Sequence, residues 1–321
     1  MSTIDRTATL IDAEAARGKL WGGGWTGADG RLEVREPATG EVLAEVGAAS
    51  GADVERAAVA AAAAQPEWAA TPASERGALM ERAADAIDAH ADEIATWLVR
   101  EGGAARAKAD FEIGLATGEL RAAAKLLGAP MEEQVEDERG RSVNRRLPVG
   151  VVGVISPWNF PMILSMRSVA PALALGNAVV LKADEHTPIG GGLAIAMALH
   201  EAGLPAGLLH VVPGGADAGQ AICTAPAIGM VSFTGSTAVG RQVGATAGRN
   251  LKRVALELGG NNAFIVLGDV DPDGAASAGA WGSFLHQGQI CMTAGRHIVH
   301  ESIADAYVEG LVARAERLPM G

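Results

Sequence analysis

The stretch VGVVGVISPWNFP, residues 149–161, decides the fold. It begins as a short apolar run rich in valine, which is typical of a strand that is buried on both faces. Pro157 and Pro161 then interrupt the run, and the chain beyond them is apolar and rich in alanine. The stretch therefore predicts a strand, a turn made rigid by two prolines, and the start of a helix.

The same alternation continues on the C-terminal side of this stretch. Helical segments rich in alanine separate further short apolar runs, and strands are expected at residues 178–181, 209–212, 230–233 and 262–266. Strands that alternate with helices predict a parallel sheet that helices cover on both faces. From residue 149 onward the fold class is therefore α/β.

The N-terminal side has a different pattern. Residues 20–44 predict short strands and turns, whereas residues 52–127 carry Ala, Leu, Glu and Arg at helical spacing. Pro66, Pro72 and Gly102-Gly103 punctuate this block and predict three helices. Residues 131–147 carry many charges of both signs and break at Gly140, which indicates a solvated hairpin arm.

Composition limits the partners and the location. A length of 321 residues predicts about two domains. The net charge is −12 and no run of Lys or Arg occurs, which argues against a nucleic-acid partner. Residues 1–20 lack the apolar core of a secretory signal, and the longest apolar stretch, 169–181, is too short and too interrupted to span a bilayer. We expect a cytoplasmic protein with no membrane partner.

The two cysteines, Cys223 and Cys291, are too few for a disulfide framework, and the seven histidines are scattered without metal-ligand spacing. We expect a reducing compartment and no metal site. Cys291 lies in QGQICMT, residues 287–293, among small and apolar residues before a turn. Such a thiol is either a nucleophile or an inert buried side chain. For Cys223, which lies between a helical stretch and a turn, we favour the inert interpretation.

Two expected strand ends carry polar candidates. Asn159 lies in the rigid turn after the first strand, where its amide could stabilise an oxyanion; the alternative is that it caps the next helix. Lys182 ends the second strand, and Glu185 follows. A cation there suits a nucleotide, and a carboxylate could accept from ribose hydroxyls and repel a 2′-phosphate. The alternative is that both side chains face solvent.

Two further segments carry candidates. Residues 233–240, FTGSTAVG, predict a strand, a turn and a helix whose N-terminus could bind a pyrophosphate, although Ser236 could also be an ordinary cap and the G-x-G-x-x-G fingerprint is absent. Glu257 lies between Leu256 and Leu258 and precedes Gly259-Gly260. An apolar frame would raise the pKa of Glu257, as suits a general base; the alternative is a turn residue near a domain junction.

Taken together and in this order, these segments resemble the aldehyde dehydrogenase family from about Trp21 to the last residue. The combination of ELGG, residues 257–260, with GQIC, residues 288–291, is the most specific feature. The resemblance implies a Rossmann-type parallel-sheet NAD-binding domain at residues 1–130 and 149–258, and a β-hairpin oligomerisation arm at 131–148. It also implies an incomplete α/β catalytic domain at 259–321, and a homo-oligomer, dimer or tetramer.

The resemblance further implies the chemistry. Cys291 would attack the aldehyde carbonyl, and the Asn159 amide and the Cys291 N–H would hold the resulting oxyanion. Hydride would pass to the nicotinamide, and Glu257 would activate the water that hydrolyses the thioester. The cofactor-binding residues would be Ile155, Ser156, Trp158, Lys182, Glu185, Phe233, Gly235, Ser236 and Leu258. The substrate-pocket residues would be Phe160, Arg167, Ile290 and Met292.

Three finer expectations follow. Glu185 favours NAD over NADP, and residues 164–171 are similar to the branch of the family that oxidises aromatic aldehydes such as benzaldehyde. Ala183 departs from the family, in which Pro often follows the lysine, but this local change should not move the ribose contacts far.

Family members also continue past Gly321, with the rest of the catalytic domain, a Glu-x-Phe-Gly-Pro segment that holds the nicotinamide ribose, and a C-terminal strand. We therefore expect the 1–321 polypeptide to be unstable or weakly active. Two other functions stay open: a CoA-acylating relative, against which Glu257 argues, and a truncated non-catalytic module that binds nucleotide or pairs subunits.

Overall fold

The structure is a computed structural model that describes residues 9–128, 131–138 and 140–319. The chain divides into two compact units, and each is described by itself: a larger unit, Met1–Glu257, and a smaller unit, Leu258–Gly321. The expectation of no secretory signal at the N-terminus depends partly on residues 1–8, which lie outside the described residues. Residues 129–130, 139 and 320–321 also lie outside the described residues.

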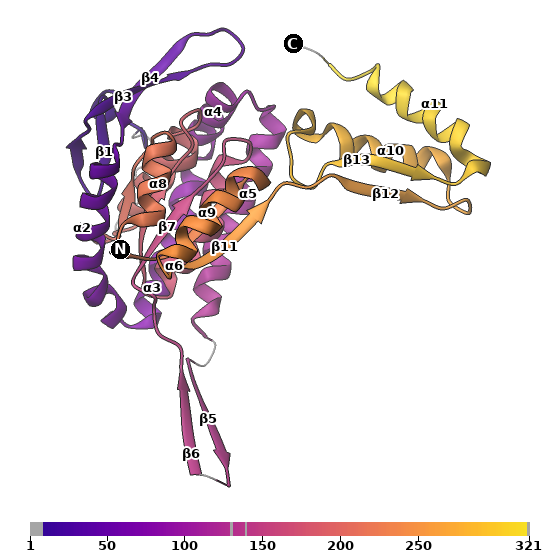
Figure 1. Ribbon diagram of the computed structural model, residues 1–321. Helices are drawn as coiled ribbons and strands as arrows, with labels where there is room; N and C mark the ends of the chain where they lie inside the picture. The colour runs from indigo at the N-terminus through magenta and orange to yellow at the C-terminus, as the bar shows by residue number, and fades with distance from the viewer. Residues whose placement is uncertain (1–8, 129–130, 139, 320–321) are drawn as a thin grey trace. The chain divides into compact units, whose positions relative to one another are not determined.

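A seven-stranded sheet, with strand order β11-β10-β7-β8-β9-β1-β2, forms the centre of the larger unit (Figure 1). Its four middle strands are parallel, and these are β10 (Ile228–Gly235), β7 (Val151–Ile155), β8 (Ala178–Lys182) and β9 (Leu209–Val211). Every residue of β7, β8 and β9 is buried. The predicted parallel sheet is confirmed. β1 (Lys19–Trp21) and β2 (Trp25–Gly27) extend it in antiparallel fashion.

Helices cover both faces of this sheet. The chain runs from β7 to β8 to β9 in one direction across the sheet, and then returns to β10 on the other side of β7. Because such crossovers are right-handed, the helices of the two directions lie on opposite faces. One face carries α6 (Pro161–Ala174), a π-turn (Ile189–Leu193) and α7 (Ala194–Glu201). The other carries α8 (Ala216–Thr224) and α9 (Thr237–Arg249), which precedes β11 (Arg253–Leu258).

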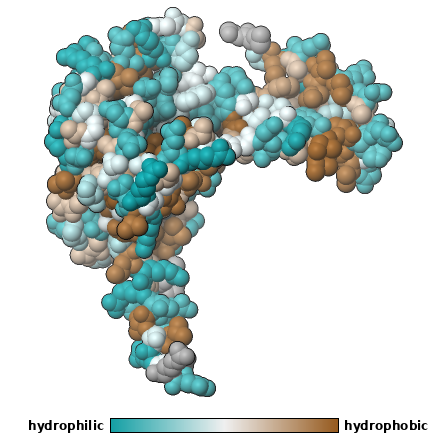
Figure 2. Space-filling model, viewed as in Figure 1, coloured by the Kyte–Doolittle hydropathy of each residue, from teal (hydrophilic) through white to brown (hydrophobic). Residues whose placement is uncertain are grey.

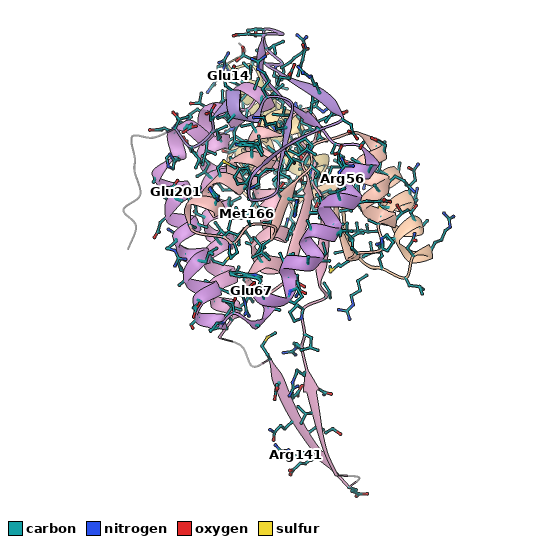
Figure 3. The ribbon with its side chains drawn as sticks, turned by 90° about the vertical axis from the view of Figure 1, so that its left-hand side faces the viewer. Glu14, Arg56, Glu67, Arg141, Met166 and Glu201 are labelled. Atoms are coloured by element: carbon teal, nitrogen blue, oxygen red, sulfur yellow. The ribbon has the colours of Figure 1, made fainter. Side chains whose placement is uncertain are left out.

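The N-terminal helical block holds four helices, so the expectation of three is wrong. They are α2 (Gly51–Ala70), α3 (Ala73–Ala89), α4 (Ala91–Gly102) and α5 (Arg106–Leu126). Pro66 lies inside α2 because tertiary contacts hold the last turns of that helix: the Trp68 indole donates to the Leu173 carbonyl at 2.7 Å. A break at His90 instead separates α3 from α4. Figure 3 marks Arg56 and Glu67 along α2, which packs against α8, whereas α3 and α5 pack against α6.

Two small antiparallel sheets complete the larger unit. β3 (Gly30–Arg35) pairs with β4 (Val42–Ala48), which agrees with the short strands expected near the N-terminus. A one-turn helix, α1 (Ala13–Ala16), precedes these strands in the chain. The predicted hairpin is confirmed as β5 (Glu132–Asp137) and β6 (Gly140–Arg145), and every side chain of β6 is exposed. Figure 3 shows Arg141 near the far end of this hairpin. Among the described residues, no helix combines the length and apolar character needed to cross a membrane.

The smaller unit is a β-α-β segment followed by a helix. β12 (Asn262–Val266), at the position expected from sequence, pairs in parallel with β13 (Ala294–Val299), and α10 (Pro272–Phe284) connects them. A 3₁₀ turn (Leu285–Gly288) follows α10, another (Glu301–Ile303) follows β13, and α11 (Ala304–Ala315) ends the described part. Val266, Ala276 and Tyr307 form the buried core. Large apolar side chains such as Ile265 and Trp281 are exposed, and Figure 2 shows hydrophobic areas on this unit.

Candidate active site and cofactor-binding edge

The sequence candidates of the larger unit gather at one edge of its sheet. The parallel strands β7, β8, β9 and β10 all end there, and the chain reverses its direction across the sheet between β7 and β10. In open α/β sheets, ligands bind outside the carboxyl ends of the strands at such a switch point. The turn that holds Asn159 follows β7, and Ser236 follows β10, so both flank this point.

Two of the helix N-termini at this edge are already filled by carboxylates from the protein itself. Glu112 of α5 accepts hydrogen bonds from the backbone N–H groups of Met162, at 2.7 Å, and Ile163, at 3.2 Å, in the first turn of α6. Glu101 of α4 accepts from the N–H groups at the start of the π-turn, Ile189 at 3.1 Å and Gly190 at 2.5 Å. Neither helix start can therefore offer these N–H groups to a phosphate.

The N-terminus of α9 is more open. Ser236 caps it and accepts from the Val239 N–H at 3.4 Å, and the first turn holds no acidic residue, whereas the first turn of α8 holds Asp217. Ser236 is exposed. This helix start therefore combines free N–H groups with positive potential, as a pyrophosphate requires. Gly235 brings the backbone close to Phe233, since a Cβ at Gly235 would lie 2.5 Å from the Phe233 ring.

Other groups occupy the capping positions of the helix that follows β7. Phe160 is the N-cap of α6 and Glu112 accepts from the first-turn N–H groups, so the alternative that Asn159 caps the helix is wrong. Asn159 is half-buried, Trp158 is 40% exposed, and the Ile155 and Ser156 side chains are buried. An amide carried by a rigid turn between two prolines is a suitable donor to a developing oxyanion.

Lys182 and Glu185 have different environments. Lys182 is buried, so the alternative that it faces solvent is wrong, whereas Glu185 is exposed. Burial lowers the pKa of Lys182, and the nearby carboxylates of Asp184, Glu185 and Asp217 oppose this shift. Asp217, on α8, was not expected from sequence: a Cβ at Gly215 would lie 3.6 Å from an Asp217 oxygen and 3.9 Å from a Glu185 oxygen. Three carboxylates therefore lie near this lysine.

Glu257 is the last residue of the larger unit. It lies on β11, which is an edge strand of the sheet, and its side chain is exposed. The interpretation as a turn residue is wrong, although the division between the two units does fall between Glu257 and Leu258. Leu256, one of the two leucines expected to frame the carboxylate, is exposed as well. Leu258 is half-buried and precedes Gly259 and Gly260.

In the smaller unit, hydrogen bonds hold the backbone around Cys291. The Asn262 side-chain amide donates to the Cys291 carbonyl at 3.1 Å and lies 3.4 Å from the Thr293 carbonyl. The Thr293 hydroxyl donates to the Gly288 carbonyl at 2.9 Å, which closes the loop on itself. His286, Gln287 and Gly288 all have positive φ, so the loop begins with three residues in the left-handed region. A fixed loop of this kind presents the thiol in a defined position.

The two cysteines differ in exposure. Cys291 is exposed and Cys223 is buried, and burial raises the pKa of the Cys223 thiol. A reactive cysteine needs access to solvent and to substrate, whereas a buried one is inert. The interpretation as a buried side chain therefore fits Cys223 and not Cys291, and the role of Cys291 as a nucleophile stays a prediction.

Comparison with known proteins identifies the family of the chain. Residues 25–321 match the model of a protein family that is described as "Aldehyde dehydrogenase family". The chain belongs to the aldehyde dehydrogenase family. It is 53% identical to the vanillin dehydrogenase of Amycolatopsis sp. over 315 residues, which are 98% of this chain and 65% of that relative. It is 51% identical to the benzaldehyde dehydrogenase [NAD(+)] of Pseudomonas putida over 307 residues, 95% of this chain and 63% of the relative.

Solved aldehyde dehydrogenase structures confirm the fold. The crystal structure of an NAD-dependent benzaldehyde dehydrogenase from Corynebacterium glutamicum superimposes with a TM-score of 0.90 at 44% identity. This likeness covers 97% of our chain and 69% of that chain. The resemblance inferred from the sequence segments is thus confirmed at the level of the family and of the α/β fold. The chain spans about 65% of the length of the curated aldehyde dehydrogenases it matches.

The expected substrate-pocket residues of this aldehyde dehydrogenase chain lie in different settings. Phe160 is buried, and the Lys108 ammonium lies 4.2 Å from the centre of its ring. Arg167 is exposed on α6, Met292 is 55% exposed, and Ile290 is half-buried. The roles of these residues, and of the catalytic and cofactor candidates, stay predictions.

Sequence reasoning missed a buried polar cluster behind this edge, formed by Glu101, Lys108 and Glu112. The available signal was a lysine and a glutamate four residues apart in α5, a spacing that brings two side chains together on a helix. The spacing alone did not distinguish this buried pair from the exposed pair Arg106–Asp110 on the same helix.

Proposed function

We propose that this chain carries the nucleotide-binding part and the nucleophile of an NAD-dependent dehydrogenase that oxidises aromatic aldehydes to carboxylic acids. The exposed Cys291 thiol, on a loop held by Asn262 in a chain that matches the aldehyde dehydrogenase family, carries this proposal. The named activities of relatives that are 51% and 53% identical, toward benzaldehyde and vanillin, support the aromatic substrate class.

Cys291 begins the reaction. Its thiolate sulfur attacks the aldehyde carbon and forms a C–S bond, while the carbonyl π electrons move to oxygen. The Asn159 amide and the Cys291 backbone N–H donate hydrogen bonds to that oxygen and stabilise its charge. The bonds from Asn262 and Thr293 around the loop support this role, because they limit movement of the backbone that carries the thiol and the N–H donor.

The residues at the sheet edge fit NAD. The open N-terminus of α9 and Gly235, where a Cβ would meet Phe233, suit the pyrophosphate, and Lys182 with Glu185 suits the adenosine ribose. The other cofactor contacts we assign are Ile155, Ser156, Trp158, Phe233 and Leu258. Bound NAD supplies the acceptor for the hydride that leaves the aldehyde carbon. A further carboxylate, Asp217, supports NAD over NADP because it adds negative charge near Lys182.

Glu257 completes the reaction. After oxidation the acyl group remains on Cys291 as a thioester. Glu257 takes a proton from a water molecule, the water oxygen bonds to the acyl carbon, and the C–S bond breaks to release the carboxylic acid and the thiolate. The exposure of Glu257 on β11 supports this role, because a water molecule can reach the carboxylate. We assign Phe160, Arg167, Ile290 and Met292 to the aldehyde pocket.

We also propose a domain organisation and an assembly. The NAD-binding domain comprises residues 1–130 and 149–258, the catalytic domain begins at 259, and residues 131–148 are a subunit-pairing arm. The division of the chain after Glu257 and the exposed β5–β6 hairpin support this organisation. A paired hairpin predicts a homo-oligomer. The free thiol of Cys291 needs a reducing compartment, which supports a cytoplasmic location.

An assay of NAD reduction tests the proposed function. Benzaldehyde, vanillin and an aliphatic aldehyde of similar size are supplied with NAD or NADP, and the acid product is identified. We expect oxidation of the aromatic aldehydes with NAD, weak in the 1–321 polypeptide, its loss in Cys291→Ala, and its retention in the matched control Cys223→Ala. Activity that survives Cys291→Ala removes the mechanism. Binding of NAD without any aldehyde oxidation favours a non-catalytic nucleotide-binding module.

A further inference from the structure

Three ionisable side chains meet in the interior of the larger unit. Glu101, near the end of α4, is 1% exposed, and Lys108 and Glu112, one turn apart on α5, are 5% and 0% exposed. The Lys108 ammonium lies 2.5 Å from one Glu112 oxygen. Both carboxylates also interact electrostatically with this lysine. We call these three residues the buried triad.

The position of the buried triad is costly and therefore needs a reason. Burial raises the pKa of Glu112 and lowers the pKa of Lys108, since the interior disfavours the charged form of each group. Well-packed apolar residues at such sites are often at least as stabilising as an ion pair. Stability alone does not account for the triad, whereas its hydrogen bonds to other parts of the chain do.

Glu112 holds the segment that carries Asn159. The Glu112 oxygen that does not contact Lys108 accepts from the Met162 and Ile163 N–H groups at the start of α6, immediately after the turn of Asn159 and Phe160. Lys108 lies 4.2 Å from the centre of the Phe160 ring, which is a cation–π contact. Both members of this pair therefore fix the position at which the Asn159 turn joins the helix.

Glu101 holds the segment that follows Lys182 and Glu185. Its two oxygens accept from the N–H groups of Ile189 and Gly190. The packing is close, because a Cβ at Gly190 would lie 2.7 Å from a Glu101 oxygen. The start of the π-turn thus packs directly against the Glu101 carboxylate, and the position of this carboxylate determines the position of the turn.

Ser165 connects the two segments. Its hydroxyl lies 2.7 Å from the Ser156 hydroxyl and 2.7 Å from the Gly191 carbonyl. A hydroxyl has one hydrogen, so Ser165 donates to the Gly191 carbonyl and accepts from Ser156. Movement of α6 is therefore transmitted to the π-turn and to the turn after β7.

We propose that Glu101, Lys108 and Glu112 are positioning residues that set, from behind the sheet edge, the oxyanion turn of Asn159 and the ribose segment of Lys182 and Glu185. This proposal rests on the proposed function, because it assigns a purpose to the positions of those three residues. The two carboxylates have separate tasks: Glu112 sets the oxyanion turn, and Glu101 sets the ribose segment.

Pairs of variants that differ only in hydrogen-bonding capacity test the Glu112 task. Lys108→Met combined with Glu112→Gln removes the ion pair but keeps an oxygen for the two N–H groups. Lys108→Met combined with Glu112→Met also removes that oxygen. Neither leaves an unpaired buried charge, so both should fold. We expect the Gln form to keep kcat for benzaldehyde within about threefold, and the Met form to lose about tenfold or more, with the KM for NAD nearly unchanged.

The Glu101 task has its own pair of variants and a direct readout. Calorimetric titration with NAD should give a Kd about tenfold higher for Glu101→Met and a smaller rise for Glu101→Gln, because glutamine retains one of the two oxygens that accept from Ile189 and Gly190 and methionine retains neither. The matched control is Asp110→Asn, which removes the carboxylate of the exposed pair with Arg106 on the same helix α5. This control should change neither kcat nor the Kd for NAD.

The outcomes separate the proposal from the proposed function. Equal kcat and equal Kd for the Gln and Met forms, with differences only in the unfolding midpoint, would show that the buried triad is merely structural and would overturn the proposal. If the unmodified protein binds NAD but oxidises no aldehyde, the proposed function fails, and the Glu101 pair still decides the positioning proposal through the Kd. If it does not bind NAD, both fail.

Discussion

Glu101 makes the stability of the larger unit depend on pH in a direction opposite to that of an ordinary salt-bridged carboxylate. It is 1% exposed, and burial, with a smaller contribution from Glu112, raises its pKa from the usual 4.5 to about 8. The N–H groups of Ile189 and Gly190, and more weakly Lys108, oppose the rise. The folded protein therefore keeps a proton that the unfolded chain releases.

The sign and the size of the effect follow from this difference. Between pH 4.5 and about 8 the folded state binds more protons than the unfolded state, so the free energy of unfolding falls as the pH rises. The stabilisation is complete below pH 4.5 and is lost as the pH passes through about 8. A pKa difference of this size corresponds to a total of about 5 kcal/mol across the window.

Urea-induced unfolding of the native chain and of Glu101→Gln, at several pH values between 5 and 8, measures this effect. Glutamine keeps one of the two oxygens that accept from these N–H groups and has no proton to lose. We expect the native chain to lose stability relative to Glu101→Gln at each step toward higher pH, while Asp110→Asn follows the native chain. Parallel pH profiles for the native chain and Glu101→Gln would refute the reasoning.

Three further changes test other parts of the structure. Gly235→Ala should weaken NAD binding about tenfold in a calorimetric titration, because the new Cβ would lie 2.5 Å from the Phe233 ring and displace the backbone; an unchanged Kd contradicts the assigned pyrophosphate contact. Glu185→Gln should improve the Kd for NADP relative to NAD about fivefold, since it removes one charge beside a 2′-phosphate; an unchanged ratio removes Glu185 from cofactor selection. Trp68→Phe should lower the free energy of unfolding by about 1–2 kcal/mol in urea, because the indole donates to the Leu173 carbonyl; no loss shows that this bond does not hold the end of α2.

The strands and the family were accessible from sequence because their signals are local. The apolar run at residues 149–155 forms a completely buried strand at Val151–Ile155. ELGG and GQIC are short motifs that can be found without knowing the secondary structure around them. The same reasoning failed at Pro66. Proline ends a helix by local rules, but a hydrogen bond from Trp68 to a carbonyl more than a hundred residues away keeps this helix intact.

The interior of the candidate site was accessible only in part, because its partners are distant in sequence. The interpretation of Asn159 as a cap was reasonable locally, and only Glu112, which is far away in the chain, shows that the capping position is taken. The burial of Lys182 also depends on residues that are distant in sequence, because nothing near Lys182 in the chain distinguishes a buried lysine from a solvated one. Asp217 lies beside Lys182 because β8 and β9 are neighbours in the sheet.

The small core of residues 258–321 has a consequence for how the nucleophile is to be handled experimentally. Three fully buried side chains and a few partly buried neighbours protect little backbone from solvent. Segments with so few apolar contacts exchange their amide hydrogens early, through brief local openings. Cys291 thus belongs to the portion of the chain that should open first, and because its thiol is already exposed, an alkylating reagent should label it without global unfolding of the protein.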